Sequence, residues 1–428
     1  MVAVLSGRDL HHTPDPIAER RYDGDFQPET PRMRTVVFVA PFFLEATLRF
    51  VRSTVALPEV RVGLLSQDPL DRVPRDIRER LAAHVRVSDA LDPQQIADGV
   101  RELAGRIGPV DRLLGALEQL QVPLAEVREA LGIEGLGVEA AQNFRDKSRM
   151  KSVLQAAGVP CARHRLVRDL AEAVAFVEEI GFPVVVKPPA GAGGRNTFRL
   201  DDLDGLRRVV ALVPPGPDAP TLIEEFVQGD EHSFDAVHVH GRPVWQSLSH
   251  YFPGPLEVLE NPWIQWCVLI PREIDHPRYD DIRKVAAHAL EVLGLGTGLA
   301  HMEWFRRADG SIAINEVGAR PPGAQFTSLI SYAHDIDLYR AWARLLVFDT
   351  FEIPPRAYAA GAAYLRGQGT GVVRAVHGLD VAQRELGPLV VEVKLPRIGQ
   401  AKASSYEGEG YVIVRHPETA VVRQALDR

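Results

Sequence analysis

A hairpin-like segment near residue 310 constrains the fold of this chain most. It reads GLAHMEWFRRADGSIAINEVGARPPG (residues 298–323), with the turn signal Asp309-Gly310 between two apolar runs. This pattern predicts two antiparallel strands that place Glu303 and Glu316 on the same face. Two adjacent carboxylates repel each other and need a cation between them, and hard oxygen ligands completed by phosphate oxygens suit Mg²⁺. A cross-strand polar pair that faces water is the alternative, although both acids are embedded in apolar residues.

Two more side chains in this segment are candidates for chemistry. Arg320 follows Glu316 after four residues and precedes Pro321-Pro322, whose rings stiffen the backbone. A guanidinium fork held beside a metal suits a phosphate group. His301 lies two residues before Glu303 on the same strand face, so we predict that it contacts a substrate. A structural histidine is the commoner alternative.

A glycine-rich loop follows a buried strand in FPVVVKPPAGAGGRNTFRL (residues 182–200). Lys187 ends the strand, where its amine stays near solvent while its stem packs. Gly191, Gly193 and Gly194 would let backbone N–H groups approach an anion closely, as phosphate loops require. The loop lacks the closing Gly-Lys-Ser/Thr of a Walker motif, and an ordinary surface turn is the alternative.

Carboxylates gather where another apolar strand ends, in LIEEFVQGDEHSFD (residues 222–235). Glu224 and Glu225 lie at the strand end, where exposed backbone groups could pair with an adenine edge. Glu231 follows a glycine-containing turn, and a carboxylate there could accept hydrogen bonds from both ribose hydroxyls. A solvated strand end with acidic decoration is the alternative.

The order of the remaining elements predicts several lobes. Strands alternate with helices over residues 33–118, which predicts parallel βαβ units, and no GxGxxG follows the first strand, which disfavours a dinucleotide site there. Residues 138–160 are predicted to form one strong helix. From about residue 357 the chain carries short strand-like pieces (372–378, 389–395 and 411–416) and a last helix.

Composition excludes several classes of protein. The 428 residues carry a net charge of -8, which argues against nucleic acid as the main partner. The two cysteines, Cys161 and Cys267, are far apart, so a disulfide framework or a cysteine metal site is not expected, and a cytoplasmic location fits. No run is long enough to span a membrane, and residues 1–31 read as a flexible tail without a signal-peptide core. His11 and His12 in this tail are expected to be surface histidines rather than metal ligands.

Taken in order, these motifs resemble those of the ATP-grasp carboxylate–amine ligases. DKSRMK, VVVKP with its glycine loop, IEEFVQGDE and two acids before ARPPG carry the resemblance over about residues 143–343. The resemblance implies an α/β protein with the ATP-grasp fold, ATP and Mg²⁺ as cofactors, and three lobes. These three lobes are a doubly wound N-terminal lobe (32–140), a central lid lobe (141–222) and a metal and substrate lobe (223–350). The tail (1–31) precedes them, and an additional β-rich C-terminal lobe (351–428) follows them.

The resemblance also implies a role for each candidate residue. Lys147 and Lys187 would contact the ATP phosphates, and the loop around Gly193 and Gly194 would close over them. Glu224 and the backbones of Glu225 and Val227 would read the adenine, and Glu231 would hold the ribose. Glu303 and Glu316 would ligate magnesium, and Arg320 would bind the transferred phosphoryl group. Many members carry an asparagine where this chain has Gly318, so either Asn315 compensates or a second metal is held more weakly.

The implied activity is a ligase that activates a small carboxylate, such as an amino acid, as an acyl-phosphate and joins it to an amine. The partners are therefore small molecules, and a homodimer through the N-terminal lobe is left open. The aromatic residues Tyr251, Phe252, Trp263 and Trp266 either line an acyl pocket or pack in the core, while Glu257 and Glu260 either engage an ammonium or face solvent. The alternatives are a biotin-carboxylase-like or purine-pathway carboxylating enzyme and a nucleotide-binding regulator without turnover.

Overall fold

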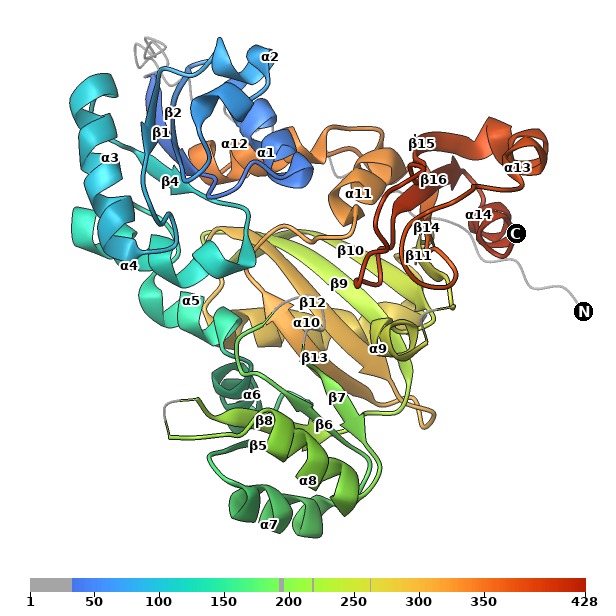
Figure 1. Cartoon of the computed structure of the whole chain (residues 1–428). Coiled ribbons are helices and arrows are strands. Elements are labelled where there is room, and N and C mark those ends of the chain that lie inside the picture. The colour runs from blue at the N-terminus through green and yellow to red at the C-terminus, as the bar shows by residue number, and fades with distance from the viewer. Residues whose placement is uncertain (1–32, 192–195, 218, 262) are drawn as a thin grey trace, which may run out of the picture. The chain divides into compact units, whose positions relative to one another are not determined.

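The computed structural model describes residues 33–191, 196–217, 219–261 and 263–428 (Figure 1). The predicted tail with His11 and His12, as well as Gly193 and Gly194, lies outside these residues. The described chain contains three sheets, and Met33–Arg428 form a single unit. The proposed lobe boundaries within this unit remain predictions.

The N-terminal sheet is parallel and has helices on both faces, which confirms the predicted βαβ units. Its strands, in spatial order, are β3 (Ala83–Arg86), β2 (Val60–Ser66), β1 (Arg34–Val39) and β4 (Arg112–Leu114). The flanking helices are α1 (Glu45–Val55), α3 (Pro93–Ile107), α4 (Gln121–Leu131) and α12 (Leu338–Phe348). Successive β1 side chains face opposite ways. Phe38 packs with Phe50 of α1 and Trp342 of α12, whereas Val37 packs with Ile96 of α3.

The second sheet is antiparallel and carries the lysine strand. Its order is β5 (His164–Val167), β8 (Thr221–Glu225), β6 (Val184–Lys187) and β7 (Phe198–Leu200). Val184, Val186 and Ile223 pack against α7 (Leu170–Ile180) and α8 (Leu203–Leu212). Strand alternation therefore turns Lys187 and Glu224 to the opposite face. The predicted boundary between residues 222 and 223 falls inside β8, which pairs along its length with β5 and β6.

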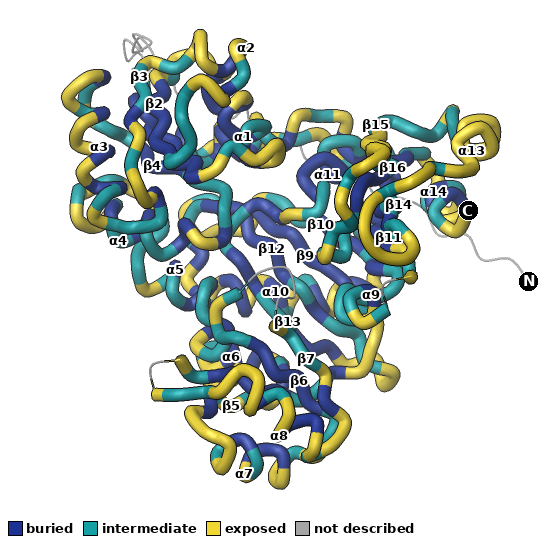
Figure 2. Tube along the Cα trace, in the orientation of Figure 1, coloured by how far each residue is buried: buried dark blue, intermediate teal, exposed yellow. Residues whose placement is uncertain are grey.

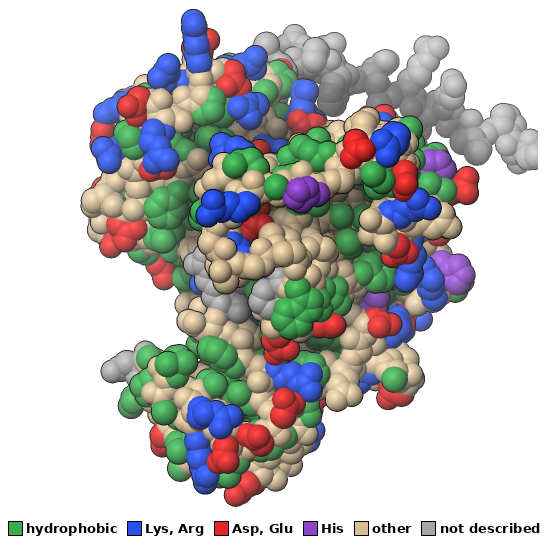
Figure 3. Space-filling view, turned by 45° about the vertical axis from the view of Figure 1, so that its right-hand side comes forward, with side chains coloured by type: hydrophobic (Ala, Val, Ile, Leu, Met, Phe, Trp, Pro, Cys, Tyr) green, Lys and Arg blue, Asp and Glu red, His purple; other side chains and the backbone are tan. Residues whose placement is uncertain are grey.

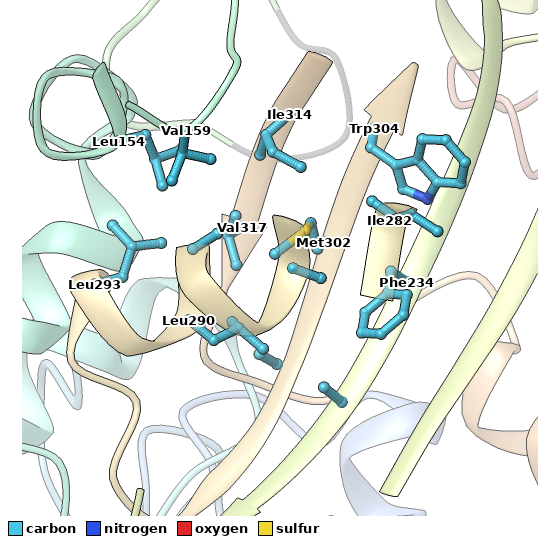
Figure 4. Close-up of a cluster of buried hydrophobic side chains, with 14 of the residues drawn as sticks. Leu154, Val159, Phe234, Ile282, Leu290, Leu293, Met302, Trp304, Ile314 and Val317 are labelled. Atoms are coloured by element: carbon cyan, nitrogen blue, oxygen red, sulfur yellow. The ribbon is translucent and has the colours of Figure 1, made fainter. Parts of the chain in front are cut away.

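The third sheet has eight antiparallel strands and carries the predicted metal acids. Its order is β13 (Ile312–Gly318), β12 (Gly298–Arg306), β9 (Asp230–Val239), β10 (Arg242–Phe252), β11 (Trp266–Ile270), β14 (Ala359–Leu365), β16 (Gly410–His416) and β15 (Val390–Lys394). The hairpin through Asp309-Gly310 is confirmed. Met302 and Trp304 join a buried cluster with α10 (Asp280–Leu293), as Figure 4 shows, so Glu303 between them points to the other face.

Two sequence predictions about local structure are wrong. The helix predicted over 138–160 is two helices, α5 (Val138–Arg145) and α6 (Lys147–Ala156). Asp146 separates them with an extended backbone, and its carboxylate accepts hydrogen bonds from the N–H groups of Ser148 and Arg149. Such a cap at an aspartate competes with helix continuation. The strand predicted at 372–378 is irregular apart from one bridge between Val372 and Ala401.

The remaining elements complete the C-terminal part of the described chain and its short connections. They are α2 (Arg75–Arg78), α9 (Pro255–Glu260), α11 (Phe326–His334), α13 (Leu379–Leu386), α14 (Thr419–Leu426) and the 3-10 turns Leu70–Arg72, Glu118–Leu120, Pro277–Tyr279 and Gly387–Leu389. Burial is concentrated in the strands, and the outer faces of the helices are exposed (Figure 2). On the face in Figure 3, acidic and basic side chains are interspersed. No described helix has both the length and the apolar character needed to cross a membrane.

Candidate active site

A cavity of about 800 Å³ lies between the lysine sheet and the eight-stranded sheet. It brings together every predicted site residue that the structure describes. They are Lys147, Lys187, Glu224, Glu225, Val227, Glu231, His301, Glu303, Glu316 and Arg320. Gly191 of the glycine loop also lines it, whereas Gly193 and Gly194 lie outside the described residues. The volume falls within the usual range for small-molecule sites.

The two predicted metal acids face each other across the β12–β13 hairpin. Glu303 pairs with Glu316 in the register, and a β-bulge follows at once, so that Trp304 pairs with Ile314. A bulge re-aims side chains. Asn315 occupies it, and its amide donates a hydrogen bond of 3.5 Å to the Glu303 carboxylate. Asn315 therefore lies beside the acids, as expected of a residue that compensates for Gly318.

The charges of these acids are not balanced within the protein. Burial, and then the charge of Glu316, raises the pKa of Glu303. Burial and the charge of Glu303 raise the pKa of Glu231 well above its ordinary value, and no described residue forms a hydrogen bond with the Glu231 carboxylate. Burial opposes ionisation of Glu316 too, but the charges of Lys147 and Lys187 outweigh it and lower the pKa of Glu316. A bound cation would relieve this repulsion.

The donor set fits a hard cation that shares its ligands with a second molecule. Paired carboxylates are the ligands that Mg²⁺ prefers. Among the described residues, no group of three or more His, Cys, Asp or Glu side chains is arranged to hold a metal ion. Glu303 and Glu316 alone would supply only part of a coordination shell, so a cation at this position would need further oxygens from another molecule.

Lys147 and Lys187 line the same cavity, and a third lysine, Lys151, is fully buried and does not line it. Lys147 begins α6, and its amine lies 2.9 Å from Glu316 and 3.1 Å from the carbonyl oxygen of Gly191. The break at Asp146 places this lysine at a helix N-terminus, where the helix dipole also favours an anion. Lys187 and the fully buried Lys151 both pair with Glu224, and Lys151 also donates to the carbonyl of Asn315.

The carboxylate of Glu224 on the lysine sheet provides a negative charge next to two lysines. It is 4% exposed and pairs with Lys187 and, at 3.2 Å, with Lys151. Burial alone would raise its pKa, but the charges of Lys151 and Lys187 lower that pKa to about 2. Its carboxylate is thus engaged by two ammonium groups. The predicted contact of Glu224 with an adenine remains a prediction.

The predicted adenine end of the cavity is apolar. Val227 packs in a small cluster with Ala162, Ala313 and Phe305. Glu225 turns its carboxylate outward to Arg163 and Arg307, and its N–H donates to the Arg163 carbonyl. Among the described residues, no hydrogen-bond acceptor is present for the N–H of Val227. Of the two backbones predicted to contact the adenine, that of Val227 is therefore the one whose N–H group is available as a hydrogen-bond donor.

Arg320 and His301 are both held by acids that the sequence analysis did not assign to the site. Arg320 pairs with the buried Glu118 from the loop after β4, and also donates to the carbonyl of Pro321 at 3.0 Å. His301 receives support from the fully buried Asp235 across the sheet, with 2.7 Å between Nδ1 and Oδ1. Both side chains line the cavity, so each is oriented before any ligand binds.

Aromatic side chains enclose the end of the cavity beyond the paired acids. Tyr251, Trp266 and Phe326 line it and pack on one another, with ring centroids 5.6–6.5 Å apart. The segment 251–266 is largely regular, because it holds the end of β10, α9 and the start of β11. Phe252 and Glu257 also line the cavity, while Trp263 is 64% exposed and neither it nor Glu260 does.

The sequence analysis missed several residues that line or support the site. Lys151 follows Lys147 by one helical turn, and this spacing alone could have marked it. Glu118 lies 202 residues before Arg320, and Tyr406, another lining residue, belongs to a loop near the C-terminus. Only the tertiary structure brings such distant residues to one cavity.

Comparisons with known proteins show which proteins this chain is similar to. The ATP-grasp domain family model matches residues 152–331. An L-arginine-specific L-amino acid ligase of Bacillus subtilis is 23% identical over 272 residues, which are 62% of this chain and 65% of that protein, so the match spans less than two thirds of the relative.

Two solved structures superpose on nearly the whole chain. An L-amino acid ligase of Bacillus licheniformis has a TM-score of 0.74 at 21% identity, covering 93% of this chain and 98% of that one. An N5-carboxyaminoimidazole ribonucleotide synthetase in its ADP complex has a TM-score of 0.69 at 15% identity, covering 92% and 96%. These likenesses confirm the predicted ATP-grasp fold.

Proposed function

We propose, on the premise that residues 152–331 are an ATP-grasp domain, that this protein is an ATP-dependent carboxylate–amine ligase. It would activate a small carboxylate, such as an amino acid, as an acyl-phosphate and join it to an amine, with release of ADP and phosphate. Relatives named as L-amino acid ligases support this assignment over the carboxylating alternative, whose solved example superposes less well.

One observation carries the proposal. The paired acids Glu303 and Glu316, of which only Glu316 forms an ion pair with a lysine among the described residues, face Lys147 and Lys187 across one cavity. Such a site attracts a cation and an anion together, as a metal-bound triphosphate requires. The apolar cluster at Val227 offers a surface for a base at the other end of the same cavity.

Each chemical step has a group in this chain that favours it. In the first step a carboxylate oxygen bonds to the terminal phosphorus of ATP, and ADP leaves. Lys187 and Lys147 orient the phosphates and neutralise their charge, and Arg320, held by Glu118, provides a fixed guanidinium for the transferred group. Bound Mg²⁺ would neutralise phosphate oxygens, with Glu303 and Glu316 as its protein ligands.

In the second step an amine nitrogen bonds to the acyl carbon. The carbon–oxygen bond to phosphate breaks, phosphate leaves, and the nitrogen loses a proton. Exclusion of water during this step would protect the acyl-phosphate from hydrolysis. His301, fixed by Asp235, lines this part of the cavity and is proposed to contact a substrate.

Hydroxylamine trapping tests the assignment, because hydroxylamine converts an acyl-phosphate into a stable hydroxamate. Each of the twenty common L-amino acids is supplied singly with ATP, Mg²⁺ and hydroxylamine, and the hydroxamate and phosphate are measured. We expect hydroxamate with a subset of the acids and none without ATP. Phosphate release that depends on bicarbonate and on no amino acid would instead establish the carboxylating alternative, and no ATP turnover with any acid would favour a regulator.

A further inference from the structure

A loop from the C-terminal part of the chain reaches into the candidate active site. Tyr406 lies well beyond the ATP-grasp match at residues 152–331, yet it lines the same cavity as Glu303, Glu316 and Arg320. Its ring packs edge-on against Trp266, with centroids 4.6 Å apart and planes at 72°. It therefore extends the aromatic wall formed by Tyr251, Trp266 and Phe326.

The loop is built to hold this position. Glu409, which is 3% exposed, accepts hydrogen bonds of 2.6 Å from the N–H groups of Gly367 and Ala403. Its own N–H donates to the Leu365 carbonyl at the end of β14. A buried carboxylate that accepts several backbone hydrogen bonds fixes the local backbone firmly. The two ends of the segment 403–409 are thus tied to one strand end.

The chain just after β14 also holds a second wall of the cavity, which is formed by α9. Arg366 is buried, and its guanidinium donates to the carbonyl oxygens of Val258 and Ile264 at 2.8 Å and 2.6 Å, on either side of the turn after α9. Leu256 and Leu259 of α9 line the cavity. The residues after β14 therefore position two walls, α9 and the Tyr406 loop, in relation to each other.

The environment of the Tyr406 hydroxyl suits a hydrogen-bond donor. No described residue forms a hydrogen bond with this hydroxyl, although the side chain is half-buried. Burial, and then the negative charges of Glu407, Glu303 and Glu316, raises the pKa of Tyr406, so the phenol stays protonated at neutral pH. Arg320 lines the same cavity, and its positive charge opposes this rise in the pKa of Tyr406. A carboxylate bound between Arg320 and Tyr406 would receive donors from both sides.

We propose that Tyr406 binds the acid substrate, with its hydroxyl donating a hydrogen bond to the carboxyl group that is activated and its ring, with Trp266, contacting the substrate side chain. Glu409 acts as a positioning residue, because it reaches the substrate only through the loop that carries Tyr406. The inference rests on the proposed ligase function and adds a determinant of substrate selection outside the ATP-grasp match. The chemistry of the wall favours acids with apolar or aromatic side chains.

Steady-state hydroxamate formation by the full-length protein tests this inference, with each accepted L-amino acid as the probe. Tyr406→Phe keeps the ring and removes the donor. We expect the KM for the acid to rise about 10-fold, the usual loss for a hydrogen bond to a charged group, while the KM for ATP is unchanged. Tyr406→Ala also removes the ring, so we expect a further rise of about 10-fold that is largest for aromatic acids.

Two further variants separate binding from general damage to the fold. Tyr411→Phe is the matched control, because Tyr411 lies in the same part of the chain but bonds Glu392 at 2.7 Å and does not line the cavity. It should leave both KM values unchanged. Glu409→Gln should raise the KM for the acid and leave that for ATP unchanged, since it loosens only the loop.

The outcomes distinguish the inference from the function on which it rests. Hydroxamate formation by the unmodified protein with an unchanged acid KM in Tyr406→Phe would overturn the role of Tyr406 and leave the ligase function standing. A parallel rise in the KM for ATP would also overturn it, because the tyrosine would then act on the whole site. If the unmodified protein activates no acid at all, the ligase function fails, and the inference fails with it.

Discussion

The two walls of the cavity differ in how far their charged side chains are paired with opposite charges. On the lysine sheet, Glu224 lies between Lys151 and Lys187, so the wall carries its own counter-charge. On the eight-stranded sheet, Glu231 and Glu303 are half-buried acids whose pKa values are raised by burial and by neighbouring acids. Only Glu316 is compensated, by Lys147 from across the cavity.

The lysine wall thus has a counter-charge of its own, whereas the acidic wall, formed by Glu231, Glu303 and Glu316, lacks enough positive charge for all its acids. A buried pair of opposite charges keeps its geometry in the absence of a ligand. Buried acids without cations instead raise the free energy of the folded state until a cation binds. The lysine wall is therefore preorganised, and the acidic wall stores repulsion that a bound cation releases. The predictions below test each wall.

The largest effect is expected on the acidic wall. Glu316→Gln removes one of the paired carboxylates and leaves the Lys147 amine without its anion. We expect turnover to fall about 100-fold to 1000-fold, the range seen when one group that stabilises transition-state charge is lost. The measurement is ATP-dependent phosphate release with an accepted amino acid. Glu418→Gln, which changes an exposed acid before α14, is the control. Full turnover in Glu316→Gln would refute the metal assignment.

A smaller effect is expected on the lysine wall. Lys187→Ala removes one cation but leaves Glu224 paired with Lys151, so we expect the fold to remain intact. Loss of a charged hydrogen bond to phosphate should weaken ATP binding about 10-fold to 100-fold. Titration calorimetry with ATP measures the affinity, and circular dichroism checks the fold. Lys284→Ala, at an exposed position on α10, is the matched control. Undiminished ATP affinity in Lys187→Ala would exclude the assigned phosphate contact.

The smallest effect is on stability and depends on pH. The pKa of Glu303 is raised in the folded protein, so between the ordinary value of 4.5 and the raised value the folded state binds more protons than the unfolded state. Stability is thus lost as the pH rises through this window. Glu303→Gln removes the repulsion, and we expect it to stabilise the metal-free protein by about 1 kcal/mol at pH 8 and by almost nothing at pH 4.

Urea unfolding without divalent cations at both pH values measures this effect. The exposed Glu291→Gln on α10 serves as the reference, because its carboxylate is solvated in both states. Magnesium should stabilise the unmodified protein more at pH 8 than at pH 4, and Glu303→Gln should reduce that gain. An equal change at both pH values would show that the acidic wall stores no repulsion.

Much of the fold could be predicted because its signals are local. The alternation of apolar runs predicted the parallel N-terminal sheet, and Asp309-Gly310 predicted the hairpin and the pairing of Glu303 with Glu316. Local sequence signals gave a wrong prediction where a single side chain determined the backbone conformation. Asp146 caps α6 and divides the predicted helix, although the surrounding periodicity continues on both sides. The cap competes with the helix through a short-range hydrogen bond that periodicity does not register.

The sequence by itself determined which residue types stand at the ends of the key strands, and so the lysine and the acids that define the site. The tertiary structure decided which charges are compensated. Glu118 holds Arg320 and Asp235 holds His301, each from another part of the chain, and Glu409 ties the loop of Tyr406 to the end of β14. The physical reason is that a charge is balanced by what lies within a few ångströms of it, and for these residues that distance is set by the packing of sheets and loops far apart in sequence.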